Sequence, residues 1–263
     1  MIQVVHPAVV GGFVALFLFF GILALLAVGR WFGKRVIAKH GGEGPSTIGS
    51  LETAVFALLG LLIAFTFSGA LQRFDMRRAQ VVEEANAVGT AWARLDLLPP
   101  AVQQPVRDAL KEYVSSRVAT YQKIDDPRAA SQEAERSVAL QAKAWSAAMA
   151  ALAHPDTKPG TNIIVAPALN DLFNFSTIRL TAMQIHPPTV IYVMLVGLSL
   201  VSALLAGFQS AGERKPDWLH RIAFGGIIAF TVYVIFEIEY PRSGFVRIDA
   251  IDQVLVDARN QMK

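Results

Sequence analysis

A chain of 263 residues that is 53% apolar and 17% charged, with a mean hydropathy of +0.41, is too apolar for one soluble domain and too charged to lie wholly within a membrane. Its net charge of +3 comes from scattered Lys and Arg, so the composition gives no reason to expect a nucleic-acid partner. The absence of cysteine excludes disulfides, thiolate metal sites and thiol catalysis. A mixed, multi-span membrane protein is the class that fits.

The first predicted element is an apolar run of membrane-spanning length, residues 9–28. No basic stretch precedes it and no small-residue cleavage site follows it, so we expect a retained span and not a signal peptide. Basic residues and then the glycine-rich stretch 41–46 come next, a composition typical of a flexible loop.

The second apolar run, residues 51–71, organises the chain because it passes without a turn signal into a charged, helix-patterned segment. Its only charge is Glu52, at the edge. Apolar residues continue beyond it at three- and four-residue steps, namely Phe74, Val81, Ala85, Val88, Trp92 and Leu95. The spacing predicts one helix that leaves the bilayer intact and stops only at the proline pair 99–100.

Two faces of this second span have different predicted roles. Small residues that would let a neighbouring helix approach closely occupy one face, namely Thr53, Ala57, Gly60, Ala64 and Ser68. The bulky residues Leu59, Ile63 and Phe67 follow one another at four-residue steps. They are consistent with lipid contact, with ordinary packing, or with an apolar pore constriction.

The rest of the chain is predicted to be helical. With the segment 73–98, the helices 102–124, 127–153 and 163–185 would form a four-helix bundle outside the bilayer. Residues 189–208 and 219–238 read as a third and a fourth span, with small residues for close packing at Ser199, Ala203, Gly207, Gly225, Gly226 and Ala229. The predicted fold class is therefore all-α, with four transmembrane helices and a helical bundle inserted between the second and third spans.

This pattern divides the chain into four parts. Residues 1–71 hold the first two spans and a short basic loop, residues 72–188 the extramembrane bundle, and residues 189–240 the last two spans. In residues 241–263 a short amphipathic helix presents Ile251, Val254, Leu255 and Ala258 on one face.

Charged residues at the ends of the spans allow two interpretations each. Glu237 or Glu239 would pair with Arg242 at the interface, or would contribute to a charged ring at a pore mouth in an oligomer. The residues Arg73, Arg77 and Arg78 would anchor the helix to lipid phosphates, or would raise the local concentration of anions.

Polar residues farther along the same helix are predicted to be structural. Glu84 and Asn86 would hydrogen-bond to neighbouring helices of the bundle, and Gly89 would mark a close helix crossing. No His lies at metal-ligand spacing from a carboxylate, and the sequence has neither a phosphate-binding glycine loop nor a nucleophile elbow. We therefore expect no enzymatic activity, no metal and no cofactor.

The charge rule does not fix which side of the membrane the bundle faces, because seven basic residues in the short loops oppose six beside the spans at the bundle. The seven are Arg30, Lys34, Arg35, Lys39, Arg214, Lys215 and Arg221, and the six are Arg73, Arg77, Arg78, Arg179, Arg242 and Arg247.

The junction between the second span and the bundle resembles the bestrophin-like family of bacterial membrane proteins over nearly the whole chain. The motifs that carry the resemblance are Arg73-Phe74-Asp75 with Arg77-Arg78, then residues 84–90, then Leu95-Asp96-Leu97-Leu98, and a Pro-Arg-Ser-Gly segment at 241–244. This resemblance implies an inner-membrane, multi-pass protein, and it places the bundle in the cytoplasm.

More distantly, the junction is similar to true bestrophins, pentameric anion channels with an apolar neck on the second span. Ala70, Arg73, Phe74 and Arg78 match their pattern after the neck, whereas the acidic calcium clasp is missing, so calcium gating is not implied. The resemblance implies a homo-oligomeric channel for small anions, with Leu59, Ile63 and Phe67 as the neck and Arg73, Arg77 and Arg78 beyond it. The alternative is a non-conducting, membrane-anchored sensor or scaffold whose bundle binds a partner.

Overall fold

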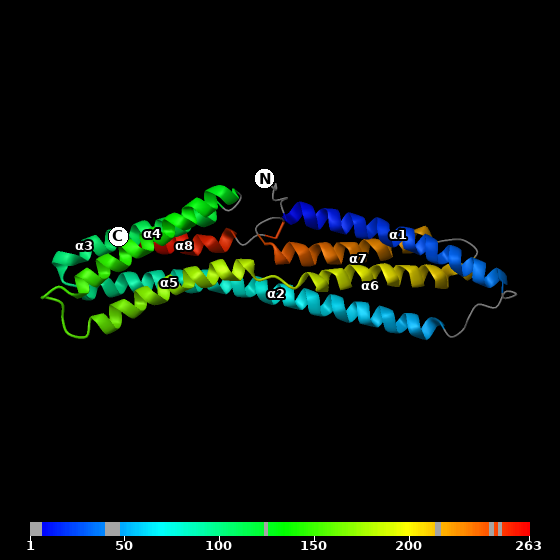
Figure 1. The fold of residues 1–263 in the computed structure, drawn as a ribbon, viewed down its shortest axis with the longest axis horizontal. Helices are drawn as coiled ribbons and strands as arrows, with labels where there is room; N and C mark the ends of the chain where they lie inside the picture. The colour runs from blue at the N-terminus through cyan, green and yellow to red at the C-terminus, as the bar shows by residue number, and fades with distance from the viewer. Residues whose placement is uncertain (1–6, 40–47, 124–125, 214–216, 242–244, 247–248) are drawn as a thin grey trace. The chain divides into compact units, whose positions relative to one another are not determined.

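The computed structural model describes residues 7–39, 48–123, 126–213, 217–241, 245–246 and 249–263, and within these residues it contains helices and no strand. Figure 1 shows the eight α-helices of this part of the chain. They are α1 (Pro7–Lys39), α2 (Ile48–Arg94), α3 (Pro100–Gln122), α4 (Pro127–Leu152), α5 (Asn162–Gln184), α6 (Thr189–Gln209), α7 (Trp218–Glu239) and α8 (Asp249–Gln261). The predicted all-α fold is confirmed.

Helix boundaries follow the signals in the sequence. Helix α2 runs without a break to Arg94, and a short 3-10 turn (Leu95–Leu97) leads to Pro99, after which Pro100 begins α3. Proline suits this first position because its missing N–H would have no partner there. Asp126 caps α4 by accepting hydrogen bonds from the backbone N–H groups of Arg128 and Ala129.

Among the described residues, four helical stretches are long and apolar enough to cross a membrane, Val9–Lys39, Glu52–Leu97, Asn162–Gly212 and Trp218–Glu239. Each of them overlaps one of the predicted spans. The chain also divides into two compact units. Unit 1 comprises Met1–Phe74 and His186–Val246, and unit 2 comprises Asp75–Ile185 and Arg247–Lys263.

In unit 1, α1 packs along α6 and α7 (Figure 1). The α1–α6 contact is so close that a Cβ added to Gly29 would lie 2.0 Å from the carbonyl oxygen of Leu204. A Cβ added to Gly207 would lie 2.2 Å from the carbonyl oxygen of Leu26. Small residues therefore create this crossing, as predicted for Gly207 on the third span.

The small residues of α2 do not pack in the way that the sequence suggested. Thr53, Ala57, Gly60, Ala64 and Ser68 are all exposed, and a Cβ added to Gly60 would meet no described atom within 4 Å. The opposite side of α2 supplies the buried contacts instead, through residues such as Leu59 and Ala70. The small face is therefore left uncovered by the described part of its own chain.

Unit 2 is built around a core to which α2, α3, α4, α5 and α8 all contribute. Helix α3 packs along α4, and α8 packs on α3 (Figure 1). The predicted amphipathic tail is indeed a helix, and it completes the core of unit 2 by burying Leu255 and Met262. The expected loop at 41–46 and the residues 242–244, which include Arg242, lie outside the described residues.

Candidate functional site

The three neck candidates on α2 do not share one environment. Leu59 is only 3% exposed and belongs to the core of unit 1, Ile63 is half-buried against that core, and Phe67 is 37% exposed. The reason is helix geometry, because each four-residue step turns the direction of the side chain by about 40°. Over two such steps the side chains turn from the side of α2 that is buried in unit 1, at Leu59, to the side that is exposed in the described chain, at Phe67. We call this exposed side the open side of α2.

The open side of α2 alternates small and bulky residues. Leu58, Leu61 and Phe65 are exposed by about half or more and flank the exposed small residues Ala57 and Ala64. An exposed apolar face on a span meets lipid or another subunit.

Arg73, an anion-attracting candidate, is held in an ion pair within unit 1. Its Nε and Nη2 both lie 2.9 Å from Oε2 of Glu239, a carboxylate that is fully buried. Nδ1 of His186 lies 3.1 Å from the other oxygen of the same carboxylate, and the imidazole stacks on the ring of Tyr240. The predicted partner of Glu237 or Glu239 was Arg242, which lies outside the described residues. Among the described residues, Arg73 pairs with Glu239 from 166 positions away.

Glu237 hydrogen-bonds to backbone that follows α7. Its carboxylate is buried and accepts hydrogen bonds from the backbone N–H groups of Phe245, at 2.6 Å, and Val246, at 3.5 Å. The two acidic residues at the end of the fourth span thus have separate partners.

In unit 2, Arg77 satisfies the end of a helix. This buried guanidinium donates from Nε to the carbonyl of Ala182, at 3.2 Å, and from Nη2 to the carbonyl of Ile185, at 3.0 Å. The last carbonyls of a helix lack partners within the helix, so Arg77 acts as a cap for α5. The exposed Arg78 instead lies 3.6 Å from the carboxylate of Asp75, one helical turn earlier.

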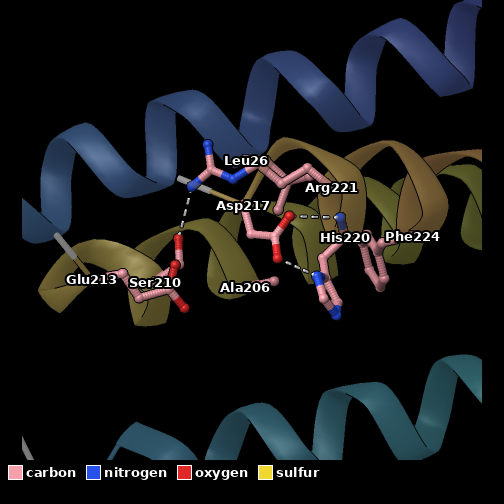
Figure 2. Close-up of a pocket in the computed structure, with 8 residues that line it drawn as sticks. All are labelled: Leu26, Ala206, Ser210, Glu213, Asp217, His220, Arg221 and Phe224. Atoms are coloured by element: carbon pink, nitrogen blue, oxygen red, sulfur yellow. Dashed lines mark hydrogen bonds and ion pairs between the residues drawn. The ribbon is translucent and has the colours of Figure 1, made fainter. Parts of the chain in front are cut away.

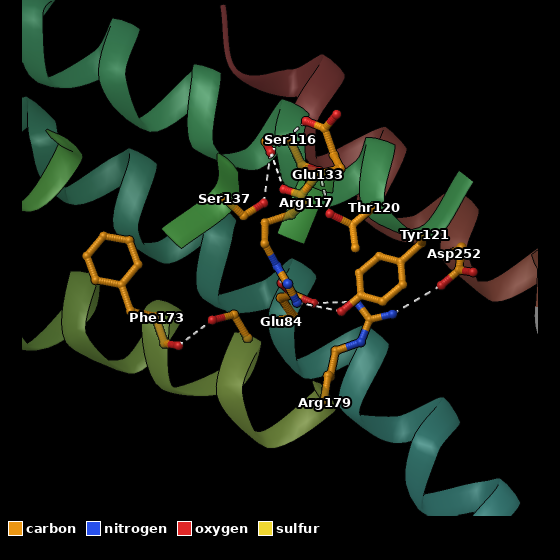
Figure 3. A network of polar contacts seen from close by, with 11 residues as sticks. Glu84, Ser116, Arg117, Thr120, Tyr121, Glu133, Ser137, Phe173, Arg179 and Asp252 are labelled. Atoms are coloured by element: carbon orange, nitrogen blue, oxygen red, sulfur yellow. Dashed lines mark hydrogen bonds and ion pairs between the residues drawn. The ribbon is translucent and has the colours of Figure 1, made fainter. Parts of the chain in front are cut away.

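Glu84 is the centre of a buried network (Figure 3). Its Oε1 accepts a hydrogen bond of 2.9 Å from Nε of Arg117, and its Oε2 accepts one from Nη1 of Arg179. Arg179 also bonds Asp252 on α8 at 3.2 Å, and its guanidinium lies 3.7 Å from the centre of the Tyr121 ring. Two buried cations therefore face two carboxylates, and the charges balance.

A second polar cluster joins α3 to α4 (Figure 3). Oγ of Ser116 donates to Oε1 of Glu133 at 2.8 Å and lies at the same distance from Oγ of Ser137. The hydrogen bond from Lys123 to Glu133, at 2.7 Å, is the main reason that the pKa of Glu133 is lowered, with Ser116 and Arg136 acting in the same direction.

The sequence motif therefore separates into buried and exposed parts. Glu84 is buried and hydrogen-bonded to residues of α3 and α5, and Phe74 packs against the core of unit 1. Asn86 and Gly89 are exposed, and a Cβ added to Gly89 would meet nothing within 4 Å. The helix crossing predicted at Gly89 is therefore not present among the described residues.

Sequence reasoning did not assign roles to Arg117 or to the Arg179 contact. A signal was present in α3, where Arg117 continues the spacing of the buried residues Leu110, Tyr113 and Val114. A charged residue on the apolar side of a helix requires a buried partner. In the residues that the structure describes, no three His, Asp or Glu side chains gather as a metal site would require.

These observations define the class of the molecule as a multi-pass, helical membrane protein with a separate helical unit and a balanced buried charge network. A family model, the Bestrophin-like domain, matches residues 11–251, and the chain therefore belongs to the bestrophin-like family. Neither the curated proteins nor the solved structures gave a match.

Proposed function

We propose that this protein is the subunit of a homo-oligomeric channel for small anions in the bacterial inner membrane, with α2 lining the conduction path. The observation that carries the proposal is the open side of α2. Along the span, apolar and small residues remain exposed while the opposite side is packed within unit 1. Membership of a bestrophin-like family, known for channels rather than enzymes, supports the same function.

An apolar constriction favours anions over small cations because weakly hydrated ions lose water at lower cost. Of the three neck candidates, Phe67 is the residue whose exposure suits such a constriction, with Ile63 at its border. Leu59 would support the neck from behind, since it is buried in the core of its own unit. The family resemblance suggests five subunits.

Arg73 would supply positive potential near this constriction. Its ion pair with the fully buried Glu239 reduces that potential, while the side chain of Arg73 itself stays 23% exposed. The pair therefore sets the charge that an ion would meet, and changing either partner should change the selectivity.

The direct test is flux through the purified protein in liposomes, with chloride and sodium gradients of equal size. We expect chloride-selective flux, with Phe67→Ala changing conductance or selectivity and Ile63→Ala having a smaller effect. Flux that is equal for sodium and chloride, or identical in wild type and Phe67→Ala, would contradict the neck assignment.

A second candidate function, a non-conducting scaffold, is favoured by a groove in unit 2. This groove lies between α4 and α5 and is lined by Trp145 and Phe173 together with the amides Gln141, Asn170 and Asn174. If the folded, oligomeric protein passes neither ion, deletion of residues 101–161 should abolish partner capture while the spans remain inserted. Retained capture would exclude the scaffold.

A further inference from the structure

A pocket of about 500 Å³ lies in unit 1 at the end of the helices where α6 turns into α7 (Figure 2). One part of its lining is apolar and consists of Leu26, Ala206 and Phe224. The other part is polar and includes Ser210, Glu213 and Arg221. A pocket of mixed character at the end of membrane-crossing helices suits an amphiphile, whose chains lie in the bilayer and whose polar group lies at its surface.

Two guanidinium groups lie at this pocket, Arg221 in its lining and Arg30 bonded to the lining residue Glu213. Arg30 is 6% exposed and donates from Nη2 to the backbone carbonyl of Glu213 at 2.8 Å, while its buried Nη1 has no acceptor in the described part of the chain. In Figure 2, Arg221 reaches across to Ser210, and the Nη2–Oγ distance is 3.0 Å. Two guanidinium groups beside one pocket are the donors that a phosphate group requires.

A carboxylate without a partner lies in the first turns of α2, the helix whose Phe56 packs on Phe224 of the pocket lining. Glu52, in the first turns of α2, is 1% exposed, and neither of its oxygens accepts a hydrogen bond among the described residues. Helices α2 and α7 both start at this end, and the ring of Phe56 lies 6.1 Å from that of Phe224 in the pocket wall. Glu52 precedes Phe56 by one helical turn, just as Arg221 precedes Phe224 by about one turn.

These carboxylate and guanidinium groups together require a ligand that carries both a positive and a negative charge. A buried carboxylate is stable in the ionised form only beside a cation, and an orphaned guanidinium N–H is stabilised by an anionic acceptor. The carboxylates of Glu52 and Glu213 and the guanidinium groups of Arg30 and Arg221 together match a neutral ligand that has separate positive and negative groups. Asp217 and His220 largely satisfy one another, through a contact of 2.5 Å.

We propose that this pocket binds the headgroup of a phospholipid bearing a phosphate and a primary ammonium group, as ethanolamine phospholipids do. The phosphate accepts from Arg221 and Arg30, the ammonium donates to Glu52 and Glu213, and the acyl chains follow the apolar wall at Leu26 and Phe224. This site is independent of conduction, so it stands or falls separately from the channel proposal.

The test uses the full-length protein in detergent micelles, offered ethanolamine, choline and glycerol phospholipids with identical acyl chains, with retained lipid counted by native mass spectrometry. The choline group has no N–H to donate and the glycerol headgroup has no ammonium. Because hydrogen bonds to charged groups are the stronger ones, we expect retention of the ethanolamine lipid to be roughly tenfold higher than that of the other two. Equal retention of all three lipids by the wild-type protein would overturn the proposal without any variant.

Single substitutions test which residue binds the ammonium group and which binds the phosphate. Glu52→Gln should reduce retention of the ethanolamine lipid to the level of the choline lipid, and Arg221→Gln should reduce retention of all three. The exposed residues Glu83 and Arg128 provide the matched controls Glu83→Gln and Arg128→Gln, which should leave retention unchanged. Displacement of the bound lipid by millimolar inorganic phosphate alone would identify a site for a soluble anion and would overturn the lipid assignment.

Discussion

Replacing Glu84 by Gln should destabilise unit 2 strongly. Glu84 is 1% exposed and accepts hydrogen bonds from Arg117 and Arg179, which are 2% and 4% exposed. A hydrogen bond to a charged group contributes about 1.5–3 kcal/mol, and removal of one partner of a buried ion pair costs about 3–5 kcal/mol. We expect a loss near 3–5 kcal/mol, because Gln leaves two buried cations facing one remaining carboxylate, that of Asp252.

The assay is urea unfolding of the full-length protein in detergent, followed by tryptophan fluorescence. Trp92 and Trp145 lie in unit 2, so a background with Trp31→Phe and Trp218→Phe makes the signal report on that unit alone. The exposed neighbour supplies the control, since Glu83→Gln should stay within about 0.5 kcal/mol of the parent.

A double variant separates charge balance from packing. Glu84→Leu with Arg117→Leu removes one charge of each sign and leaves Arg179 paired with Asp252. It should therefore be more stable than Glu84→Leu alone, as is found when buried ion pairs are replaced by apolar residues. A loss below about 1 kcal/mol for Glu84→Gln, or a double variant less stable than the single one, would refute the reasoning.

Three further predictions concern other parts of the chain. The pKa of Glu133 is lower in the folded protein than in the unfolded chain, so the ionised carboxylate stabilises the fold above the unfolded-state pKa, and this stabilisation is lost as the pH falls through the folded-state pKa. The urea midpoint of the wild type should therefore fall more steeply below about pH 4.5 than the urea midpoint of Glu133→Gln. Gly29→Ala should destabilise unit 1 by about 1–3 kcal/mol through overpacking against Leu204, whereas Gly197→Ala, which meets nothing within 4 Å, should not; thermal unfolding in detergent checks both. Glu239→Gln should raise, and Arg73→Gln should lower, the chloride-to-sodium permeability ratio in planar bilayers, and equal ratios in the two variants would refute the assigned role of the pair.

The sequence was sufficient for the helices because their signals are local. Apolar runs, proline pairs and the cap at Asp126 lie within a few residues of the boundaries that they define. Membership of the family also followed from short sequence motifs, most of them on α2, and the match over residues 11–251 confirms it.

Partners distant in the sequence could not be deduced in the same way. The ion pair between Arg73 and Glu239 joins residues 166 positions apart, and the sequence did not indicate it because proximity along the chain is the only distance that a sequence provides. The small residues of α2 also meet no helix among the described residues, since a small residue permits close approach but does not require it. Helix geometry explains the difference at the neck, where four-residue steps drift around the helix between Leu59 and Phe67.

The contact between Arg179 and Asp252 also fixes an order of events during synthesis. The two residues are 73 positions apart, and the last two spans must be made before α8 can leave the ribosome. At about 5–20 residues per second, this interval lasts about 4–15 s. Until then the nascent bundle carries two buried arginines against the single carboxylate of Glu84 and lacks the helix that covers α3. Unit 2 is therefore completed only after the last two spans have been made, and a chain truncated before α8 should be recognised by quality-control proteases even when all its spans are inserted.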